Sequence, residues 1–352
     1  MKKRILSALT AAAATIVSAS AFDVKIDNIY YNIINGEYLE VTSAEPYPDE
    51  ILYPKTETPP AQKTIARYRD DYAINDYSGD IIVPDSVEIE TLGERLEVRQ
   101  ISHCAFFNAP NLESVTLPAT IKKLGNKAFA CSSIKRLDMG DTTVGAITDD
   151  MCYACKDLSE VILPESLIHI GESAFMTSGL KSITLPGKVR ALICKTFAYT
   201  DLSEIKGLES VESYSYDCFQ KTKLKQIIIY ECIRNLSFNA FKDLEYLENV
   251  ISMKTDPEDF DILSYYSMDS VFRNSNPDCT LWVPDESLEL YKASSRWTSF
   301  FKDIRPMSQL GLSQTAAPDS ENIRYFDMTG RQVDEPTPGH LYITSDGRKI
   351  QF

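Results

Sequence analysis

One stretch recurs along this chain and restricts its fold more than any other feature. Leu167 to Pro186, LIHIGESAFMTSGLKSITLP, carries apolar and turn residues in an order that returns every 22 to 24 residues. Repeats of this length indicate a solenoid, in which each coil packs against its neighbours in the stack. Aligned on Phe175, the aromatic anchors of the other coils are Phe106, Phe129, Tyr153, Phe197, Phe219 and Phe241.

Aliphatic residues hold fixed places around each anchor. The coil of Tyr153 fits this register only with one inserted residue, which puts Val144 and Ile147 nine and six residues before it. A lone coil exposes its aliphatic face, whereas stacking covers it, and each buried Phe or Leu then contributes about 1.5–3 kcal/mol. In the coil of Phe175 the aliphatic positions are Leu167, Ile170, Leu180 and Ile183.

Each coil is predicted to contain one short strand. In Ser182–Pro186 the side chains alternate, so that the second and fourth point inward and the first and third point to solvent. The closing proline ends the strand because it has no N–H to offer the next coil. Before the anchor, Gly171 and Gly125 mark a tight corner, where we expect a positive φ that is cheap only for glycine.

These positions together spell I-G-x-x-A-F-x-x-x-x-L-x-x-I-x-L-P, from Ile170 to Pro186. The pattern resembles the BspA-like class of leucine-rich repeats found in bacterial secreted and surface proteins of the Bacteroidetes type. The resemblance implies a mainly β fold: a leucine-rich repeat solenoid with N- and C-terminal caps and a small C-terminal β tail. It also implies adhesion to proteins of a host or of other cells.

The pattern divides the chain into six parts. Asn35-Gly36 predicts a hairpin in the N-terminal part, and Pro46 to Pro60 predicts a surface loop. Near the other end we expect Asp285 to cap a helix through Lys292. The parts are 1–21, a signal peptide; 22–97, the N-terminal cap and first irregular coil; 98–253, the regular repeats; 254–307, the C-terminal cap; 308–320, a polar linker; and 321–352, the β tail.

The N-terminus predicts export. A positive end at Lys2 to Arg4, an apolar run from Ile5 to Val17 and the small residues Ala19-Ser20-Ala21 form the three parts of a secretory signal, in an order that a buried N-terminal helix would not need. We expect no transmembrane segment, and a location at the cell surface or outside the cell, with the periplasm as the alternative. The formal net charge of −15 disfavours nucleic acid as a partner, because binding phosphates requires many cations.

The chain has eight cysteines, which in an exported protein invite a disulfide framework. Most of them lie close to an anchor aromatic, where a small side chain fits inside the coil. Three states follow from this placement: buried free thiols, bridges between adjacent coils, and metal ligands. The Cys152-x-x-Cys155 pair resembles half of a zinc site, but no second pair stands at the required spacing.

No arrangement of residues predicts catalysis, a cofactor or a metal. His103 and Cys104 are neighbours on an alternating segment, so their side chains should diverge, and no phosphate loop or nucleophile elbow is present. Asp256, Asp259 and Asp261 lack the glycine turn and distant glutamate of a calcium loop, which favours a solvated loop. We therefore expect a protein that is not an enzyme.

The outward side chains of the repeated strand remain as the candidate for recognition. Most are polar, as a plain solvated face requires, but Ile162 and Ile228 are not, and exposed isoleucines in a regular sheet favour contact with a partner. The function we expect is adhesion or ligand binding, to a host or bacterial surface protein or a glycan; the alternative is a structural component of the cell envelope. The candidate ladder is Ser114, Thr116, Arg136, Asp138, Glu160, Ile162, Ser182, Thr184, Glu204, Lys206, Gln226 and Ile228.

The β tail resembles the C-terminal sorting regions of exported Bacteroidetes proteins, with a Y-D-x-x-G-R-x-V-like run before a G-x-Y-I-like strand. It serves either in sorting or anchoring, or as a passive strand appendage. If it is a sorting signal, deletion of residues 321–352 should abolish surface exposure, as measured by cell fractionation and protease accessibility. Unchanged exposure would reject the sorting role.

Overall fold

The computed structural model describes residues 22–44, 74–261 and 266–310, together with the backbone of four strands between residues 325 and 351. The chain divides into two compact units, Met1–Lys206 and Gly207–Phe352. The predicted signal peptide, the proline-rich loop at 46–60 and residues 311–320 of the predicted linker lie outside the described residues.

The first unit begins with an antiparallel hairpin. The sheet that contains this hairpin is made of the strands β1 (Val24–Ile26), β2 (Ile29–Ile34), β3 (Tyr38–Thr42), β5 (Ser86–Ile89) and β6 (Glu94–Ile101). Between β2 and β3, Asn35 and Gly36 have φ values of 53° and 71°, as a type I′ turn requires. This confirms the predicted hairpin. β3 then pairs in parallel with β6, which leads into the coils.

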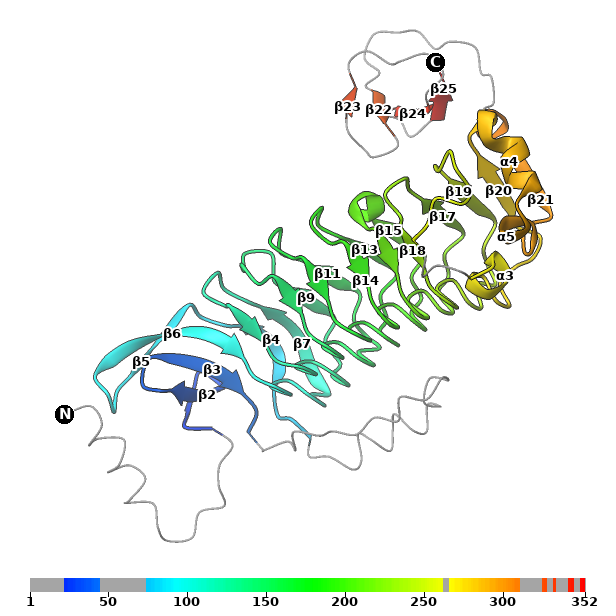
Figure 1. Ribbon diagram of the computed structural model, residues 1–352. Helices are drawn as coiled ribbons and strands as arrows, with labels where there is room; N and C mark the ends of the chain where they lie inside the picture. Colours follow the sequence, from blue (N-terminus) through cyan, green and yellow to red (C-terminus); the bar gives the residue numbers. More distant parts are fainter. Residues whose placement is uncertain are drawn as a thin grey trace. The chain divides into compact units, whose positions relative to one another are not determined.

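The rest of this unit is a stack of coils (Figure 1). The longer strands are β4 (Ser78–Ile82), β7 (Asn111–Thr116), β9 (Arg136–Asp138), β11 (Glu160–Ile162), β13 (Ser182–Thr184) and β15 (Glu204–Lys206). The two-residue strands are β8 (Lys123–Leu124), β10 (Ala146–Ile147), β12 (His169–Ile170) and β14 (Ala191–Leu192). Strands pair in parallel from coil to coil, as β7 with β9 and β10 with β12, which confirms the predicted β-solenoid.

The inward anchors form the core of the stack. Phe106 lies on Phe129 with ring centroids 5.0 Å apart, and Phe175 lies on Phe197 with centroids 5.6 Å apart. The rings in each pair are nearly parallel, and all four side chains are fully buried. Because each ring is covered by the next coil, no coil could bury its own core alone.

The anchor of the third regular coil is Cys152 and not Tyr153, so the alignment on Tyr153 is wrong. The residues two before and two after each phenylalanine anchor have positive φ. In this coil those residues are Asp150 and Ala154, with φ of 55° and 57°, which centres the turn on Cys152. No inserted residue is then needed. Tyr153 packs one position farther on, in a separate cluster with Phe107.

The glycines before the anchors have a different role from the predicted one. Neither Gly125 nor Gly171 has a positive φ. A Cβ on Gly125 would lie 2.2 Å from the backbone nitrogen of His103, and one on Gly171 would lie 2.5 Å from the carbonyl carbon of Thr148. Glycine is required because the backbone of the preceding coil approaches too closely for any side chain.

The second unit continues with the same kinds of strand and adds short helices. Its strands are β16 (Ser213–Tyr214), β17 (Gln226–Ile229), β18 (Asn235–Leu236), β19 (Asn249–Ser252), β20 (Thr280–Val283) and β21 (Asp303–Pro306). Its helices are η1 (Leu208–Ser210), α3 (Met268–Val271), η2 (Asp285–Ser287), α4 (Leu288–Ala293), α5 (Ser295–Thr298) and η3 (Met307–Gln309). β17, β19, β20 and β21 form one parallel sheet, which extends the repeat pattern to Pro306.

Aromatic side chains stack on both sides of Phe272 in the second unit. Phe272 stacks on Phe241 at 5.0 Å and on Phe300 at 5.3 Å.

The prediction that Asp285 caps the following helix is wrong, because no side-chain capping bond is present there. The Asp285 carboxylate instead accepts a hydrogen bond from the Ser308 backbone N–H at 3.0 Å, which ties the chain after β21 to the start of η2.

The tail forms its own sheet. Its strands are β22 (Tyr325–Asp327), β23 (Gln332–Val333), β24 (Leu341–Thr344) and β25 (Lys349–Gln351). They are antiparallel, in the order β23-β22-β24-β25. The G-x-Y-I-like strand of the predicted β tail is therefore present as β24.

The buried stack predicts a large cost for removing one ring. Phe175→Ala should reduce the free energy of unfolding by about 3–5 kcal/mol, because the neighbouring coils cannot collapse into the space. Ser182→Ala, on the exposed face of the next strand, should change it by less than about 0.5 kcal/mol. Urea denaturation measures both, and a loss below about 1 kcal/mol for Phe175→Ala would contradict the inward position of the ring.

Candidate functional site

The candidate ladder residues of the first unit lie on neighbouring parallel strands, in register. Ser114 and Thr116 on β7 pair with Arg136 and Asp138 on β9, which pair in turn with Glu160 and Ile162 on β11. On the next two strands, Ser182 and Thr184 pair with Glu204 and Lys206. The residues between them, such as Leu137 and Ile183, point into the core. The structure thus brings the predicted rows together on one face of the sheet.

This face is interrupted between β11 and β13. β11 belongs to the sheet β11-β9-β7-β4, whereas β13 pairs with β15 in a separate sheet. In the coils of β9 and β13 the residue after the strand donates to the next coil, as the Met139 N–H does to the Ile162 C=O at 3.0 Å and the Leu185 N–H does to the Lys206 C=O at 2.9 Å. No corresponding bond joins β11 to β13 within the described coils, so two strand edges face each other across a gap.

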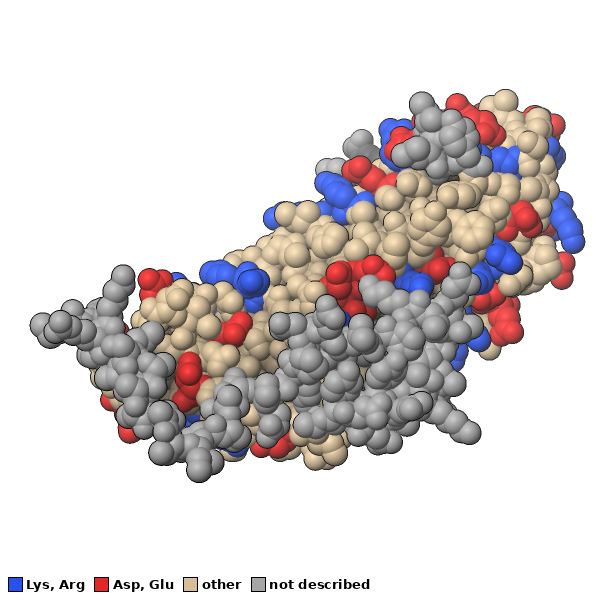
Figure 2. Space-filling model, turned by 60° about the horizontal axis from the view of Figure 1, so that its bottom comes forward, with Lys and Arg blue, Asp and Glu red and all other residues tan. Residues whose placement is uncertain are grey.

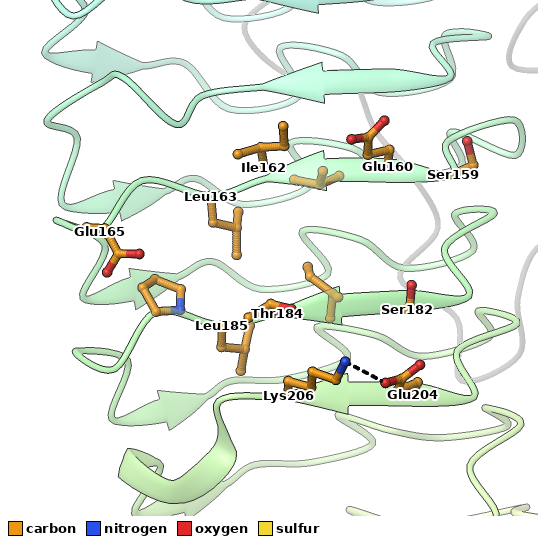
Figure 3. Close-up of a pocket in the computed structure, with 13 residues that line it drawn as sticks. Ser159, Glu160, Ile162, Leu163, Glu165, Ser182, Thr184, Leu185, Glu204 and Lys206 are labelled. Atoms are coloured by element: carbon orange, nitrogen blue, oxygen red, sulfur yellow. Dashed lines mark ion pairs between the residues drawn. The ribbon is translucent and has the colours of Figure 1, made fainter. Parts of the chain in front are cut away.

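A cleft of about 370 Å³ occupies this gap (Figure 3). Ile162 and Leu163 line it from the side of β11, and Leu185 lines it from the side of β13. Val161, whose counterparts in neighbouring coils are buried, is half-exposed here. The cleft therefore leaves the inward side chain of Val161 less covered than in the two adjacent coils, whereas Leu163 and Leu185 remain buried. The other lining residues are Ser159, Glu160, Glu165, Ser182, Ile183, Thr184, Pro186, Glu204 and Lys206.

Paired charges surround the cleft. The Lys206 ammonium lies 2.9 Å from the Glu204 carboxylate, as Figure 3 shows. On the side of β11, the Arg136 guanidinium lies 2.7 Å from Asp138 and 3.2 Å from Glu160. Both cations are therefore partly neutralised. Figure 2 shows both acidic and basic side chains on the face that it presents, in separate groups.

Ile228, the other isoleucine of the ladder, has a different environment from Ile162. Ile228 on β17 packs against a cluster of Ile251, Trp282 and Leu310. Leu310 follows η3, so this chain covers its own sheet face at that point. The apolar character of Ile228 is explained by contact within the protein, and only Ile162 remains beside an open cleft.

His103 and Cys104 do not diverge as the alternating pattern predicts. The His103 Nε2 lies 3.2 Å from the Cys104 Sγ, because Cys104 has a φ of 56° that turns its side chain back. Burial raises the pKa of the Cys104 thiol to about 12. The thiol therefore stays protonated at neutral pH, and the pair is not an activated nucleophile.

The described chain includes all eight cysteines, and no disulfide joins any of them. Cys194 and Cys232 are half-buried, and the others are buried. Of the three states that the sequence left open, the structure contains thiols inside the coils. No group of three or more His, Cys, Asp and Glu side chains among the described residues is placed to hold a metal ion.

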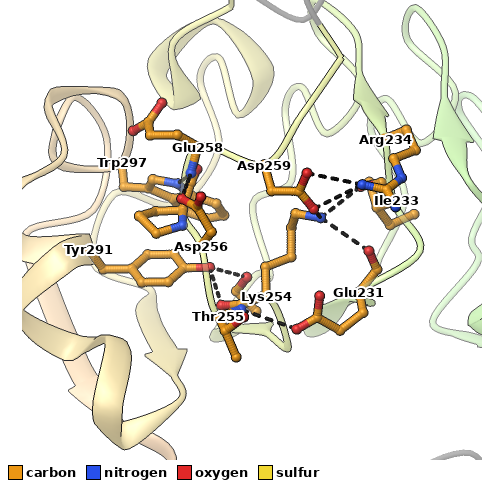
Figure 4. A network of polar contacts seen from close by, with 12 residues as sticks. Glu231, Ile233, Arg234, Lys254, Thr255, Asp256, Glu258, Asp259, Tyr291 and Trp297 are labelled. Carbon is orange, nitrogen blue, oxygen red and sulfur yellow. Dashed lines mark hydrogen bonds and ion pairs between the residues drawn. The ribbon is translucent and has the colours of Figure 1, made fainter.

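One member of the acidic cluster in the second unit, Asp259, is bonded to a buried lysine (Figure 4). The Lys254 side chain is fully buried, and its ammonium donates to the carbonyls of Glu231 at 3.1 Å and Ile233 at 3.0 Å. It also donates to the Asp259 carboxylate at 3.0 Å, which pairs on its other side with Arg234. Asp259 is solvent-exposed, in agreement with the predicted solvated loop, and its carboxylate is in addition the counterion of a core cation.

The fold and the site together define the class of protein. Coils of 22 or 23 residues, with an aliphatic and aromatic core and a parallel sheet along one face, make a leucine-rich repeat solenoid. The family model for the BspA type leucine rich repeat region matches six copies in this chain, over residues 86–200 and 169–264. The matches span about half of the chain, which belongs to this family.

Solved structures of similar fold come from several bacteria. A leucine rich cell surface protein from Faecalibacterium prausnitzii is 16% identical with a TM-score of 0.49, covering 77% of this chain and 73% of its own. A leucine-rich repeat protein from Bacteroides ovatus is 18% identical with a TM-score of 0.40, covering 81% and 76%. The T. pallidum leucine rich repeat protein is 18% identical with a TM-score of 0.35, covering 55% and 85%.

A comparison with curated proteins finds no match. Within the described residues, no helix has the length and apolar character needed to cross a membrane.

The cleft between β11 and β13 is the feature that sequence reasoning missed. Its strands carry the same alternation as their neighbours, so no local signal could have revealed the interruption.

The lysine network predicts a pH-dependent contribution to stability. Hydrogen bonding to Lys254 lowers the pKa of Asp259. A lowered folded-state pKa means that the contribution is complete above the unfolded value of about 3.9 and is lost as the pH falls through the folded value. At pH 7, Asp259→Asn should cost about 1–3 kcal/mol, because it removes one partner of a buried ammonium.

Asp261→Asn is the matched control, because the Asp261 carboxylate is exposed and lies two residues away. Urea denaturation of both variants at pH 7 and at pH 3 measures the difference. We expect Asp259→Asn to be the less stable variant at pH 7 and the gap to narrow at pH 3. Equal stability at pH 7 would show that Asp259 does not support Lys254.

Proposed function

We propose that this protein is exported and binds a partner protein through the sheet face of its first unit, centred on the cleft between β11 and β13. The observation that supports this most is the interruption of the backbone ladder. It leaves two strand edges open, with the side chains of Val161 and Ile162 half-exposed beside them. Apolar surface of this kind, rimmed by polar residues, is typical of interaction sites.

A protein is the partner that this chemistry favours over a glycan. Among the described residues that line the cleft, none is aromatic, whereas Val161, Ile162, Leu163 and Leu185 are aliphatic. An aliphatic side chain of a partner could be buried there, and its backbone could pair with the open strand edges. The paired charges of Glu204 with Lys206 would then form the rim, where charge affects orientation more than affinity.

The same proposal includes the location of the protein. The three-part N-terminal signal directs the chain out of the cytoplasm, and display or secretion then presents the sheet face to other proteins. The family resemblance makes adhesion to host or bacterial surface proteins the leading form of this binding. A partner outside the cell would also account for a fold in which all the regular residues serve the core and only the outward rows vary.

Two matched arginine variants test the cleft. Thr184→Arg places a long cation at the cleft, and Thr116→Arg places the same side chain on the corresponding rung of β7, two strands beyond β11. The full chain, immobilised on beads, is incubated with surface extracts of host cells and of bacteria, and retained proteins are cross-linked and identified by mass spectrometry. We expect Thr184→Arg to weaken retention at least tenfold, equal to about 1.4 kcal/mol, and Thr116→Arg to change it little.

Melting temperatures of both variants exclude a folding defect as the cause. Retention that Thr184→Arg leaves unchanged would remove the cleft from the binding surface. Binding on a glycan array together with no retained protein would replace the protein partner with a carbohydrate.

A further inference from the structure

One coil departs from the repeat at two positions, and both departures are to cysteine. At the anchor, Cys152 stands where the six other regular coils have phenylalanine. Three residues later, Cys155 stands where four other coils have a hydroxyl side chain. Two coupled changes to the same residue type in a single turn indicate that the two side chains act as a pair. The hydroxyl residues are Ser132, Ser178, Thr200 and Thr222.

The turn holds the two cysteines close together. The Cys155 N–H donates to the Cys152 carbonyl at 3.3 Å, which closes a four-residue turn. Such a turn keeps its end Cα atoms within about 7 Å, and a disulfide needs about 4.4–6.8 Å. Besides burial, the neighbouring Cys155 thiol contributes to the raised pKa of Cys152, and both side chains are fully buried. The Cys155 thiol also donates to the Phe129 carbonyl at 3.0 Å, which fixes its position.

We propose that Cys152 and Cys155 form a disulfide in the exported protein, and that the structure shows the reduced form of this pair. Each thiol loses its hydrogen and one S–S bond forms; the two protons and two electrons pass to a disulfide oxidant, such as oxidised glutathione or an oxidoreductase, which is reduced to two thiols. The inference rests on export, because such bridges persist in oxidising compartments. It does not depend on the binding cleft.

The disulfide has to form during folding, before this coil is buried against its neighbours. Burial raises the pKa of the Cys152 thiol, so the thiolate that attacks a disulfide is scarce in the folded protein. Both sulfurs are also shielded from any oxidant. Oxidation therefore belongs to the folding stage, and the finished bridge would fill part of the space that a phenylalanine ring fills in the other coils. The same coil continues directly into β11, one wall of the cleft.

Thiol counting with peptide mapping tests this on the full chain. The reduced protein is refolded with oxidised and reduced glutathione, denatured without reductant, alkylated, and mapped by mass spectrometry. We expect Cys152 and Cys155 to be protected from alkylation until a reductant is added, and the six other cysteines to be alkylated at once. Glutathione added after folding should oxidise the pair at least tenfold more slowly.

Single variants identify the pair. Cys152→Ser and Cys155→Ser should each leave every remaining cysteine open to alkylation, whereas Cys104→Ser, also buried, should leave the bridge intact. The wild-type map alone decides the question if a serine variant fails to fold. Alkylation of all eight cysteines without reductant, or a bridge between other cysteines, would overturn the proposal.

Protein isolated from the envelope or medium of the producing cells, alkylated at the moment of lysis, tests the native state. A bridge in this material supports the proposal. A bridge in the refolded protein that is absent from the isolated protein would overturn it for the native chain. Neither result alters the comparison of Thr184→Arg with Thr116→Arg, so the two proposals fail separately.

Discussion

Each coil of this protein is stable only because the next coil covers it. The rings of Phe106 and Phe129, or of Phe175 and Phe197, lie face to face at about the distance between adjacent coils. That contact requires the backbones to stack closely, which is why Gly125 and Gly171 leave no room for a Cβ. The sequence repeats because every coil has to pack against its neighbours in the same way.

The same requirement limits where recognition can occur. Inward positions serve packing, and the turns around each anchor are bound by hydrogen bonds to the next coil. Only the outward rows of the longer strands are free of these demands. Even there the chain uses part of the surface itself, since Leu310 covers Ile228 and its neighbours in the second unit. The cleft between β11 and β13 is distinctive because the backbone ladder of the sheet is interrupted there, with Val161 and Ile162 half-exposed beside it.

Polar groups inside the structure follow the rule that buried charges need partners. Lys254 is fully buried and is satisfied by two carbonyls and the Asp259 carboxylate. Cys104 is kept as a neutral thiol beside His103. Clusters that could be read as chemistry in the sequence therefore act in the structure as parts of the core.

The sequence by itself determined the solenoid, the inward residues and the hairpin at Asn35-Gly36, because these depend on local periodicity and turn chemistry. It placed the ladder residues on one face for the same reason. The spacing of Val144 and Ile147 fits Cys152 without an insertion, but the aromatic identity of the other anchors favoured Tyr153, and the left-handed turn residues settle the register. The sequence could not reveal the cleft, the cover over Ile228 or the partner of Lys254. The cleft and the cover over Ile228 depend on how separate coils meet, and the bond between Lys254 and Asp259, five residues apart, depends on the path that the loop takes between them.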